Sequence, residues 1–544
     1  MTKTDINSAL GQNLPMVTGL IDPKGSKWVL TKYNGASALL PYGAFVQSRS
    51  QLLSTLSQHG VVIIPKAAKD SFMEQVGELE EFSPRVIFSR PGWHQGQFAT
   101  VSGKVYAPSK TTKGLIGFET NPIKCARKGT HSAWLQLVAG PLAGHHIPVF
   151  AIMACFAAPM LSVVGRADNF GFELSGAGGK GKSTTQRLMA SVVGPAMEKN
   201  QGYITTFNMT HVALDEAMRS HSDMPFIIDE ANLFGLGTGG RADDRAMRDF
   251  SFQMGSGVTK GKFGRVNQEG YRFIFVTSAN EPFHELLGRA HRDTANAASD
   301  RLISISIPEE DSGVFGPLPS GYQSYRAFTL ALETAMVAQY GTAMPKFLRA
   351  LVRSRHKNEA KFVGALNRRI ATFKQHVGVN ENNGSDVRVA EAFGLVYAAG
   401  EYARHTGVLP KEYDCLAAAS HCYSNYRGTV PVRQSLPDRL KAIIERPETR
   451  AVDRAALPTL SDEELEAIGA FIRVVKGETL LLMTPSFGGR MLPDWRSLMG
   501  TPAFQRLNKA DKNGRGRGYH CRVRANSKVD WFYAFKIDPI DASA

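Results

Sequence analysis

Residues Gly176 to Ser183 read Gly-Ala-Gly-Gly-Lys-Gly-Lys-Ser, a combination of glycines and cations that can bind phosphates. The spacing G-x-x-x-x-G-K-[ST] is that of a P-loop, which surrounds nucleotide phosphates with backbone N–H groups. We expect Lys182 to reach the β- and γ-phosphates of ATP, Ser183 to bind Mg²⁺, and Thr184 to contact a further phosphate. The residues expected to hold the nucleotide are Gly176, Ala177, Gly178, Gly179, Lys180, Gly181, Lys182, Ser183 and Thr184.

The residues around this loop predict the elements that must position it. Phe172 and Leu174 predict a short strand before the loop, and apolar residues recur at helical spacing from Leu188 to Val193. A glycine and a proline then predict the end of that helix at residue 194. A helix that begins at the loop points its N-terminal N–H groups and the positive end of its dipole toward a polyphosphate.

Three of the loop's glycines also fit the dinucleotide-binding fingerprint G-x-G-x-x-G, and Glu198 lies near the distance expected for an acid that binds ribose. That acid should end a second strand, whereas residues 196–200 do not have a strand pattern. The fingerprint also does not require Lys182 and Ser183. We therefore favour the P-loop.

An acidic pair lies downstream of the loop. Residues 224–230 read Met-Pro-Phe-Ile-Ile-Asp-Glu, and such an apolar run is typical of a buried parallel strand. Ligands of open α/β sheets lie at the carboxyl ends of the strands. We expect Asp229 to orient Mg²⁺ and its waters, and Glu230 to polarise the attacking water as general base. A plain strand followed by a solvated acidic turn is the alternative, and the upstream P-loop disfavours it.

A third apolar run, Phe273 to Val276, is followed by polar residues that could sense the γ-phosphate. In ring ATPases the strand beside the acidic strand ends in such a residue. Asn280 is our first choice for this role and Thr277 the second. A polar turn that only ends the strand is the alternative.

An arginine from a neighbouring subunit could neutralise charge in the transition state of hydrolysis. Arg301 precedes residues 302–307, whose alternation predicts a strand, and its position suits this role in trans. Arg289 and Arg292 are rival candidates. Local pairing of Arg301 with Asp300 is an equally good interpretation.

The charge of the chain favours a polyanionic partner. Its 544 residues carry a formal net charge of +15, more than one Mg-nucleotide site accounts for. A glycine-rich loop after the acidic strand carries Lys260, Lys262 and Arg265, which we expect to contact nucleic acid. Arg515 and Arg517 belong to a second basic stretch with the same expected role. For both stretches an ordinary exposed loop is the alternative.

The composition is ordinary for a soluble globular protein. Five scattered cysteines without a C-x-x-C pair predict neither disulfides nor structural zinc, and they favour the cytoplasm. The N-terminus lacks the apolar core of a signal peptide. Residues 147–165 carry no charge, but Pro148 and Pro159 interrupt them. We expect a buried core helix broken at Pro159 and no membrane association.

Length and patterning predict four segments. Residues 1–118 form a strand-rich accessory domain, and residues 119–310 an α/β P-loop ATPase core. Residues 311–430 form a helical lid. Residues 431–544 follow a proline-rich approach and combine helices with a basic hairpin, which suggests a small α+β, winged-helix-like domain that binds nucleic acid.

Within these segments, the accessory domain is expected to contain strands near residues 27–30, 61–64, 85–88 and 98–101. Long helical periodicity runs from Tyr325 to Arg355. Arg349 or Arg353 could reach the nucleotide from this helix, although a solvated basic face is the preferred interpretation.

In their order along the chain, these motifs resemble the family catalogued as "domain of unknown function 927", helicase-like P-loop ATPases of phages and mobile elements that often accompany primase modules. The resemblance covers roughly residues 85–420. Besides the P-loop it rests on Gly92-Trp93-His94, Trp134, Ala151, residues 157–161 and 171–174, Asp229-Glu230, Gly261-Lys262, Tyr340-Gly341 and Phe347-Leu348. It implies a RecA/AAA-like oligomeric ATPase that acts on DNA, with Lys182, Ser183, Asp229 and Glu230 in the roles given above.

Two stretches depart from the family pattern. The family loop usually reads Ser-Thr-Gly-Lys-Thr, whereas residues 179–183 read Gly-Lys-Gly-Lys-Ser. The sensor strand usually ends Thr-Gly-Glu, whereas residues 277–281 read Thr-Ser-Ala-Asn-Glu. The second departure leaves the choice between Thr277 and Asn280 open.

The leading functional hypothesis is an ATP-driven DNA helicase or translocase from the replication module of a phage or mobile element. We expect a homo-oligomer, most simply a hexameric ring on single-stranded DNA, with a primase as a candidate partner. An ATP-dependent switch or scaffold in a defence or regulatory complex is the alternative, motivated by the strand-rich N-terminal segment. A P-loop kinase of a small molecule is disfavoured by the chain's size and by its two-acid strand end.

Overall fold

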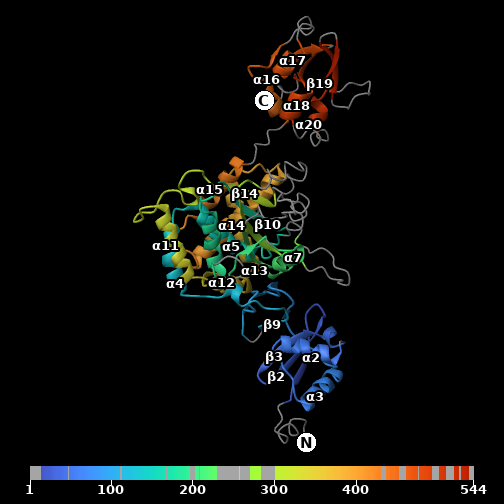
Figure 1. Cartoon of the computed structure of the whole chain (residues 1–544), viewed down its shortest axis with the longest axis vertical. Coiled ribbons are helices and arrows are strands. Elements are labelled where there is room, and N and C mark those ends of the chain that lie inside the picture. The colour runs from blue at the N-terminus through green and yellow to red at the C-terminus, as the bar shows by residue number, and fades with distance from the viewer. Residues whose placement is uncertain are drawn as a thin grey trace. The chain divides into compact units, whose positions relative to one another are not determined.

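The computed structural model describes residues 14–46, 48–110, 113–166, 168–196, 202–207, 209–229, 257, 270–282, 300–429, 436–451, 461–475, 477–492, 502–509, 520–525 and 528–537. These residues fall into two compact units (Figure 1). The first unit contains the described residues up to Thr429, and the second contains the described residues that follow it.

A five-stranded parallel sheet forms the centre of the first unit, in the order β11-β12-β13-β10-β14. Its strands are β10 (Phe170–Ser175), β11 (Thr205–Thr206), β12 (Met224–Asp229), β13 (Phe273–Ala279) and β14 (Leu302–Ser306). Every residue of β10, β12 and β13 is buried, which is why their sequences are continuous apolar runs. The predicted strands at these positions are confirmed, as is the predicted parallel α/β class.

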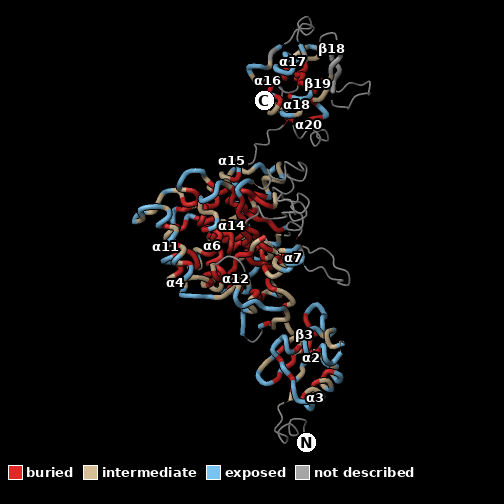
Figure 2. The backbone as a smooth tube through the Cα atoms, in the orientation of Figure 1, coloured by how far each residue is buried: buried red, intermediate tan, exposed pale blue. Residues whose placement is uncertain are grey.

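Helices cover this sheet, and the most deeply buried of them is α5 (His146–Ala157). It packs against the P-loop helix α6 (Lys182–Val193) and against α14 (Gly384–His405) and α15 (Cys415–Thr429). Figure 2 shows the buried backbone gathered around α6 and α14. The α5 helix gives way to a 3-10 turn that contains Pro159, as predicted. Within the described ranges, no helix has the length and apolar character needed to cross a membrane.

The long helical pattern after residue 325 forms two helices rather than one, α11 (Tyr325–Ala338) and α12 (Ala343–Lys357). The helical conformation is interrupted around Gly341, whose φ of 69° disfavours residues with a side chain. Its N–H donates to the carbonyl of Ser191 at 2.7 Å, and a Cβ there would collide with the carbonyl oxygen of Ala126. Close packing against the end of α6 therefore ends the helix. The next helix is α13 (Glu359–His376).

The N-terminal segment contains a four-stranded sheet in the order β3-β2-β1-β4 and two helices. Its elements are β1 (Met16–Ile21), β2 (Lys27–Tyr33), β3 (Ala36–Pro41), α2 (Arg49–Gln58), α3 (Lys66–Gly77) and β4 (Ser83–Pro84). The strand predicted at residues 61–64 is wrong, because this stretch is the connection between α2 and α3. Val61 and Ile63 are buried against the two helices, while Val62 and Ile64 are exposed. The alternation reflects one-sided packing without a sheet partner.

Short strands follow, and they include the Gly92-Trp93-His94 motif. They are β5 (Ile87–Phe88), β6 (Gly92–His94), β7 (Gln97–Ala99), β8 (Val105–Tyr106) and β9 (Leu115–Ile116). The backbone N–H of Trp93 donates to Asp223 Oδ2 at 3.0 Å, and its indole N–H donates to the carbonyl of Pro159 at 2.7 Å. A Cβ on Gly92 would collide with the Asp223 carboxylate. The motif thus anchors β6 to the residue that precedes β12.

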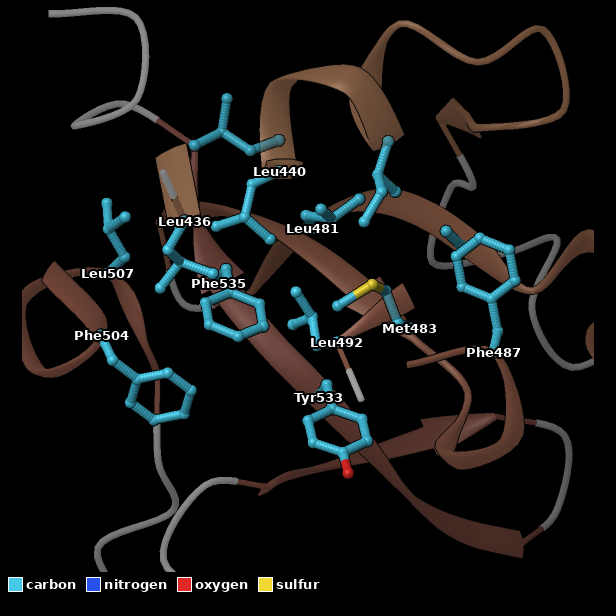
Figure 3. Close-up of a cluster of buried hydrophobic side chains, with 13 residues drawn as sticks. Leu436, Leu440, Leu481, Met483, Phe487, Leu492, Phe504, Leu507, Tyr533 and Phe535 are labelled. Atoms are coloured by element: carbon cyan, nitrogen blue, oxygen red, sulfur yellow. The ribbon is translucent and has the colours of Figure 1, made fainter. Parts of the chain in front are cut away.

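The second unit is a five-stranded sheet in the order β15-β16-β17-β19-β18, packed against short helices. Its strands are β15 (Arg450–Ala451), β16 (Ala470–Val475), β17 (Glu478–Met483), β18 (His520–Ala525) and β19 (Lys528–Lys536), and its helices are α16 (Leu436–Ile444), α17 (Asp462–Ile468), α18 (Pro485–Met491) and α20 (Pro502–Leu507). Figure 3 shows Leu481 and Phe535 of the sheet beside Leu436 and Leu440 of α16. A smaller apolar cluster around Phe471 contains the alternate residues of these strands. The winged-helix interpretation of this segment stays a prediction.

His221, after helix α7 (His211–Ser220), makes the stability of the first unit sensitive to acid. Its ring is buried against Tyr203 and Phe226, and its Nδ1 donates to the carbonyl of Ala217 at 2.6 Å. Burial lowers the pKa of His221 from 6.5 to about 3. Because the folded pKa lies below the unfolded one, this stability is complete above pH 6.5 and is lost as the pH falls toward 3.

We expect the free energy of unfolding to fall by about 2 kcal/mol between pH 7 and pH 5, measured by urea denaturation at both pH values. His131 and His421, whose pKa values are also lowered mainly by burial, contribute in the same direction. The variant His221→Asn should therefore show a smaller loss, not a complete absence of loss. Equal pH dependence in both proteins would contradict this assignment.

Candidate nucleotide-binding site

The loop between β10 and α6 has the backbone conformation that a phosphate site requires. Gly176, Gly179 and Gly181 have φ angles of 147°, 77° and 89°, a region that other residues rarely adopt. Gly181 is the N-cap of α6, and no side chain caps that end of the helix. The first N–H groups of α6 have no acceptor within the helix, so this end can donate to an anion.

The side chain of Lys182 folds back over this loop. Its Nζ donates to the carbonyl oxygens of Gly176 and Ala177, the latter at 2.8 Å, and lies 3.4 Å from Oδ1 of Asn280. Burial lowers the pKa of Lys182, and the carboxylate of Asp229 opposes this shift. Lys182 is therefore a cation held beside the loop by weak neutral acceptors, which phosphate oxygens could replace.

Asp229 is the last residue of β12 and is buried, with 8% of its surface exposed. The hydroxyl of Ser278 donates to its Oδ1 at 2.9 Å and fixes the orientation of the carboxylate. Sequence reasoning missed Ser278. The period of two along a strand could have found it, because that period places residues 278 and 280 on one face and residue 277 on the other.

The P-loop, Asp229 and the end of β13 border one cavity of about 720 Å³. Its other walls come from residues 311–315 and from α11, which belong to the segment expected to form a helical lid. Residues 311–315 are held against the P-loop by two contacts. The N–H of Val314 donates to the carbonyl of Lys180 at 3.1 Å, and Lys180 Nζ lies 3.4 Å from Asp311. The lining residues are Gly178, Gly179, Lys180, Gly181, Lys182, Ser183, Thr184, Asp229, Ser278, Ala279, Asn280, Asp311, Ser312, Phe315, Tyr325, Arg326, Thr329, Leu330 and Glu333.

Among the candidates named from the sequence, Thr277, Arg301, Arg349 and Arg353 do not line this cavity. Thr277 is completely buried within β13, and among the described residues its hydroxyl has no hydrogen-bond partner. Arg301 lies at the amino end of β14, where its carbonyl accepts the N–H of Gly171, whereas the P-loop follows the carboxyl end of β10. Arg301 therefore lies at the opposite edge of the sheet from this chain's own P-loop. Its neighbour Asp300 pairs with Arg388 at 2.9 Å.

The remaining candidates for catalysis and for nucleic-acid contact lie outside the described part of the chain. They are the general-base candidate Glu230, the loop residues Lys260, Lys262 and Arg265, the rival arginines Arg289 and Arg292, and the basic residues Arg515 and Arg517.

The positions of Asn280 and Thr277 predict different outcomes for their removal. Asn280→Ala should lower the rate of ATP hydrolysis by about tenfold, because it removes a polar group that faces the phosphate side of the cavity. Thr277→Val should leave hydrolysis within about twofold and stability unchanged or slightly higher, since it removes a buried, unpaired hydroxyl. Steady-state hydrolysis and urea denaturation measure the two effects. A larger loss of hydrolysis in the Thr277 variant would reverse the assignment.

Comparisons with known proteins cover both units. Residues 28–265 match the family described as "Domain of unknown function (DUF927)". The match confirms the resemblance, but it begins before the stretch at 85–420 and ends at residue 265, so it includes most of the N-terminal segment. No curated protein matches the chain.

Among solved structures, "SCCmec type IV Cch - active helicase" is similar with a TM-score of 0.60 and 15% identity, over 97% of this chain and 94% of that chain. At this identity the likeness shows a shared fold. "The A form apo structure of NrS-1 C terminal region-CTR" has a TM-score of 0.27 and 10% identity, over 74% of this chain and 90% of that chain, which is too low to carry an argument.

Proposed function

Since residues 28–265 match the family described as "Domain of unknown function (DUF927)", we propose that this chain is a RecA/AAA-like ATPase that moves along or unwinds DNA. The observation that carries the proposal is the meeting of the P-loop, Lys182, Asp229 and Asn280 at one cavity. The sheet order supports it. Strand β13 lies between β10 and β12, so the carboxyl ends of all three strands face the same ligand.

The residues of the cavity fit ATP with Mg²⁺. Its volume of about 720 Å³ lies within the usual range for small-molecule sites. One end offers backbone N–H groups and two lysines to phosphates, and Asp229 with Ser183 offers the oxygen ligands that Mg²⁺ prefers. Bound Mg²⁺ would neutralise charge on the phosphate oxygens of the substrate.

The chain's own groups then have separate tasks. Lys182 would exchange the carbonyl oxygens of Gly176 and Ala177 for phosphate oxygens. Asp229, oriented by Ser278, would hold the ligands of the metal in place. Asn280 would contact the terminal phosphate, and Glu230 would take the proton of the attacking water. Arg301, remote from its own P-loop, suits a neighbouring subunit's site.

A nucleic-acid partner is supported by the charge of the chain, +15 in 544 residues. The similar structure is that of an active helicase from SCCmec, which favours a helicase of a mobile element for this chain as well. We propose a homo-oligomer, most simply a hexameric ring in the cytoplasm, with single-stranded DNA as its track and a primase as a candidate partner. Contacts from Lys260, Lys262, Arg265, Arg515 and Arg517 are part of this proposal.

The proposal is tested by ATP hydrolysis with and without single-stranded DNA at modest salt. We expect DNA to bind and to stimulate turnover. Unwinding of a forked duplex then distinguishes a helicase from the ATP-dependent switch or scaffold, which should not separate strands. A protein that hydrolyses ATP but neither binds DNA nor responds to it would refute the motor and leave the scaffold.

A further inference from the structure

A second cavity, of about 610 Å³, lies at the far ends of the elements that build the nucleotide site. Val193, the last residue of α6, and Met224, the first residue of β12, both line it. Lys182 and Asp229 stand at the opposite ends of the same two elements. This second cavity is therefore separate from the nucleotide site.

Three cations from separate parts of the chain line the second cavity: Lys104 before β8, Arg127 in the loop after residue 125, and Arg349 on α12. None of its lining residues is acidic. Within the described ranges, none of the three cations makes an ion pair or a side-chain hydrogen bond. Three unpaired positive charges around one hollow are the arrangement that an anion would neutralise.

The pKa values of neighbouring groups reflect an excess of positive charge around these cations. Burial raises the pKa of Tyr106, on the cavity wall, to about 12, and Arg349 and Arg127 both oppose that shift. The pKa of His131 is lowered by burial, and Arg349 and Lys346 lower it further. The guanidinium of Arg349 thus acts on its neighbours without a compensating carboxylate.

The remaining lining gives the cavity an apolar wall beside its polar one. Met224, Leu348 and Met344 supply apolar surface, and Ser102 and Thr100 supply hydroxyl groups. The first turn of α12 also reaches the cavity, and no side chain caps that helix. A volume of this size accommodates a nucleotide unit, which pairs a phosphate with a largely apolar base face.

We propose that this second cavity binds a phosphate group carried by a nucleotide unit, with Arg349, Arg127 and Lys104 as the cations that contact it. The unit is supplied either by a single strand of DNA or by a free mononucleotide. Arg349, for which the sequence left open a nucleotide contact or, preferably, a solvated basic face, lines this second cavity. The proposal does not depend on ATP hydrolysis, so it survives if the chain is not a motor.

Cys125 offers a local readout, because it lines the cavity and is half-buried, whereas Cys155, Cys415 and Cys422 are buried. Burial raises the pKa of the Cys125 thiol to about 11, so its alkylation is slow and the rate reports access. The full chain, without ATP, is treated with N-ethylmaleimide at pH 8.5, and the Cys125 peptide is followed by mass spectrometry. The probes are a ten-nucleotide deoxythymidine strand and deoxythymidine monophosphate.

We expect at least one probe to slow alkylation of Cys125 about fivefold or more. Protection by the strand alone identifies DNA as the source of the phosphate, and protection by the monophosphate identifies the free nucleotide as sufficient. Arg349→Gln should raise the half-protecting concentration about tenfold, since it removes a charge-assisted contact. Arg353→Gln, one turn along α12 and outside the cavity, should change it less than twofold.

Arg127→Gln tests a second cation of the cavity in case the Arg349 variant unfolds. The proposal is overturned if neither probe protects Cys125, or if the Arg349 and Arg127 variants bind as well as the Arg353 variant does. Thermal melting of each variant confirms that the comparison is made between folded proteins.

Discussion

Lys182→Ala should reduce ATP hydrolysis by about 100-fold or more and abolish measurable nucleotide binding, while the chain remains folded. In the described part of the chain, Lys182 donates to carbonyl oxygens of the loop and to the amide oxygen of Asn280 and makes no ion pair, so its loss breaks only hydrogen bonds to neutral acceptors. In the nucleotide-bound state it would face the phosphates, where a missing cation costs the most. A fluorescent ATP analogue measures binding, and phosphate release measures turnover.

Lys180→Ala provides the matched control, because it removes a lysine two residues away in the same loop. The Nζ of Lys180 lies 3.4 Å from Asp311 at the rim of the cavity rather than over the loop carbonyls. We expect a loss of turnover below about tenfold, because the ion-pair partner of Lys180 is fully exposed and such a pair contributes little. Equal losses in the two variants would show that the loop needs positive charge in general and not Lys182 in particular.

Asp229→Asn should lower turnover by about 100-fold and raise the Mg²⁺ concentration for half-maximal activity about tenfold. The amide oxygen can still accept the hydrogen bond from Ser278, so the local structure should persist while the negative charge is lost. The charge is what a divalent cation requires, and Asp229 is held nearly buried at the end of β12. Hydrolysis measured across a Mg²⁺ titration gives both quantities.

Asp311→Asn is the control for this substitution, since Asp311 lines the same cavity but its side chain is fully exposed at the rim. Its Mg²⁺ dependence should match that of the unmodified chain. If Asp229→Asn also leaves the Mg²⁺ dependence unchanged, Asp229 does not support the metal and the proposed role is wrong.

The sequence was most informative where a strand is buried on both faces. The strands β10, β12, β13 and β14 are continuous or alternating apolar runs, and these runs end where the candidate site begins, so the central sheet and the P-loop could be predicted together. Val61 to Ile64 has the same apolar character but no neighbouring strand. The sequence of these four residues does not indicate whether a partner strand lies beside them.

The rest of the site depends on contacts between residues far apart in sequence. Tyr325 and Leu330 of α11 line the nucleotide cavity about 150 residues beyond the P-loop. A helical lid was expected from this segment, but the spacing does not indicate which of its residues face the loop. The break at Gly341 likewise follows from the carbonyl of Ala126, more than 200 residues earlier. Arg349, for which a solvated basic face was the preferred interpretation, shows the same limit, since periodicity identifies the helix but not the cavity that it borders.

Strand β12 joins the two cavities, with Met224 at one and Asp229 at the other. It is six residues long, roughly 17 Å, and β11 and β13 flank it within the sheet. It pairs with β13 from Met224 to Ile227 and with β11 at Ile228 and Asp229. An extended strand held in this ladder cannot shorten, so a displacement of Met224 is relieved only by movement of its far end or by rupture of the ladder. Occupancy of one cavity would then alter affinity at the other, and the same factor must operate in both directions.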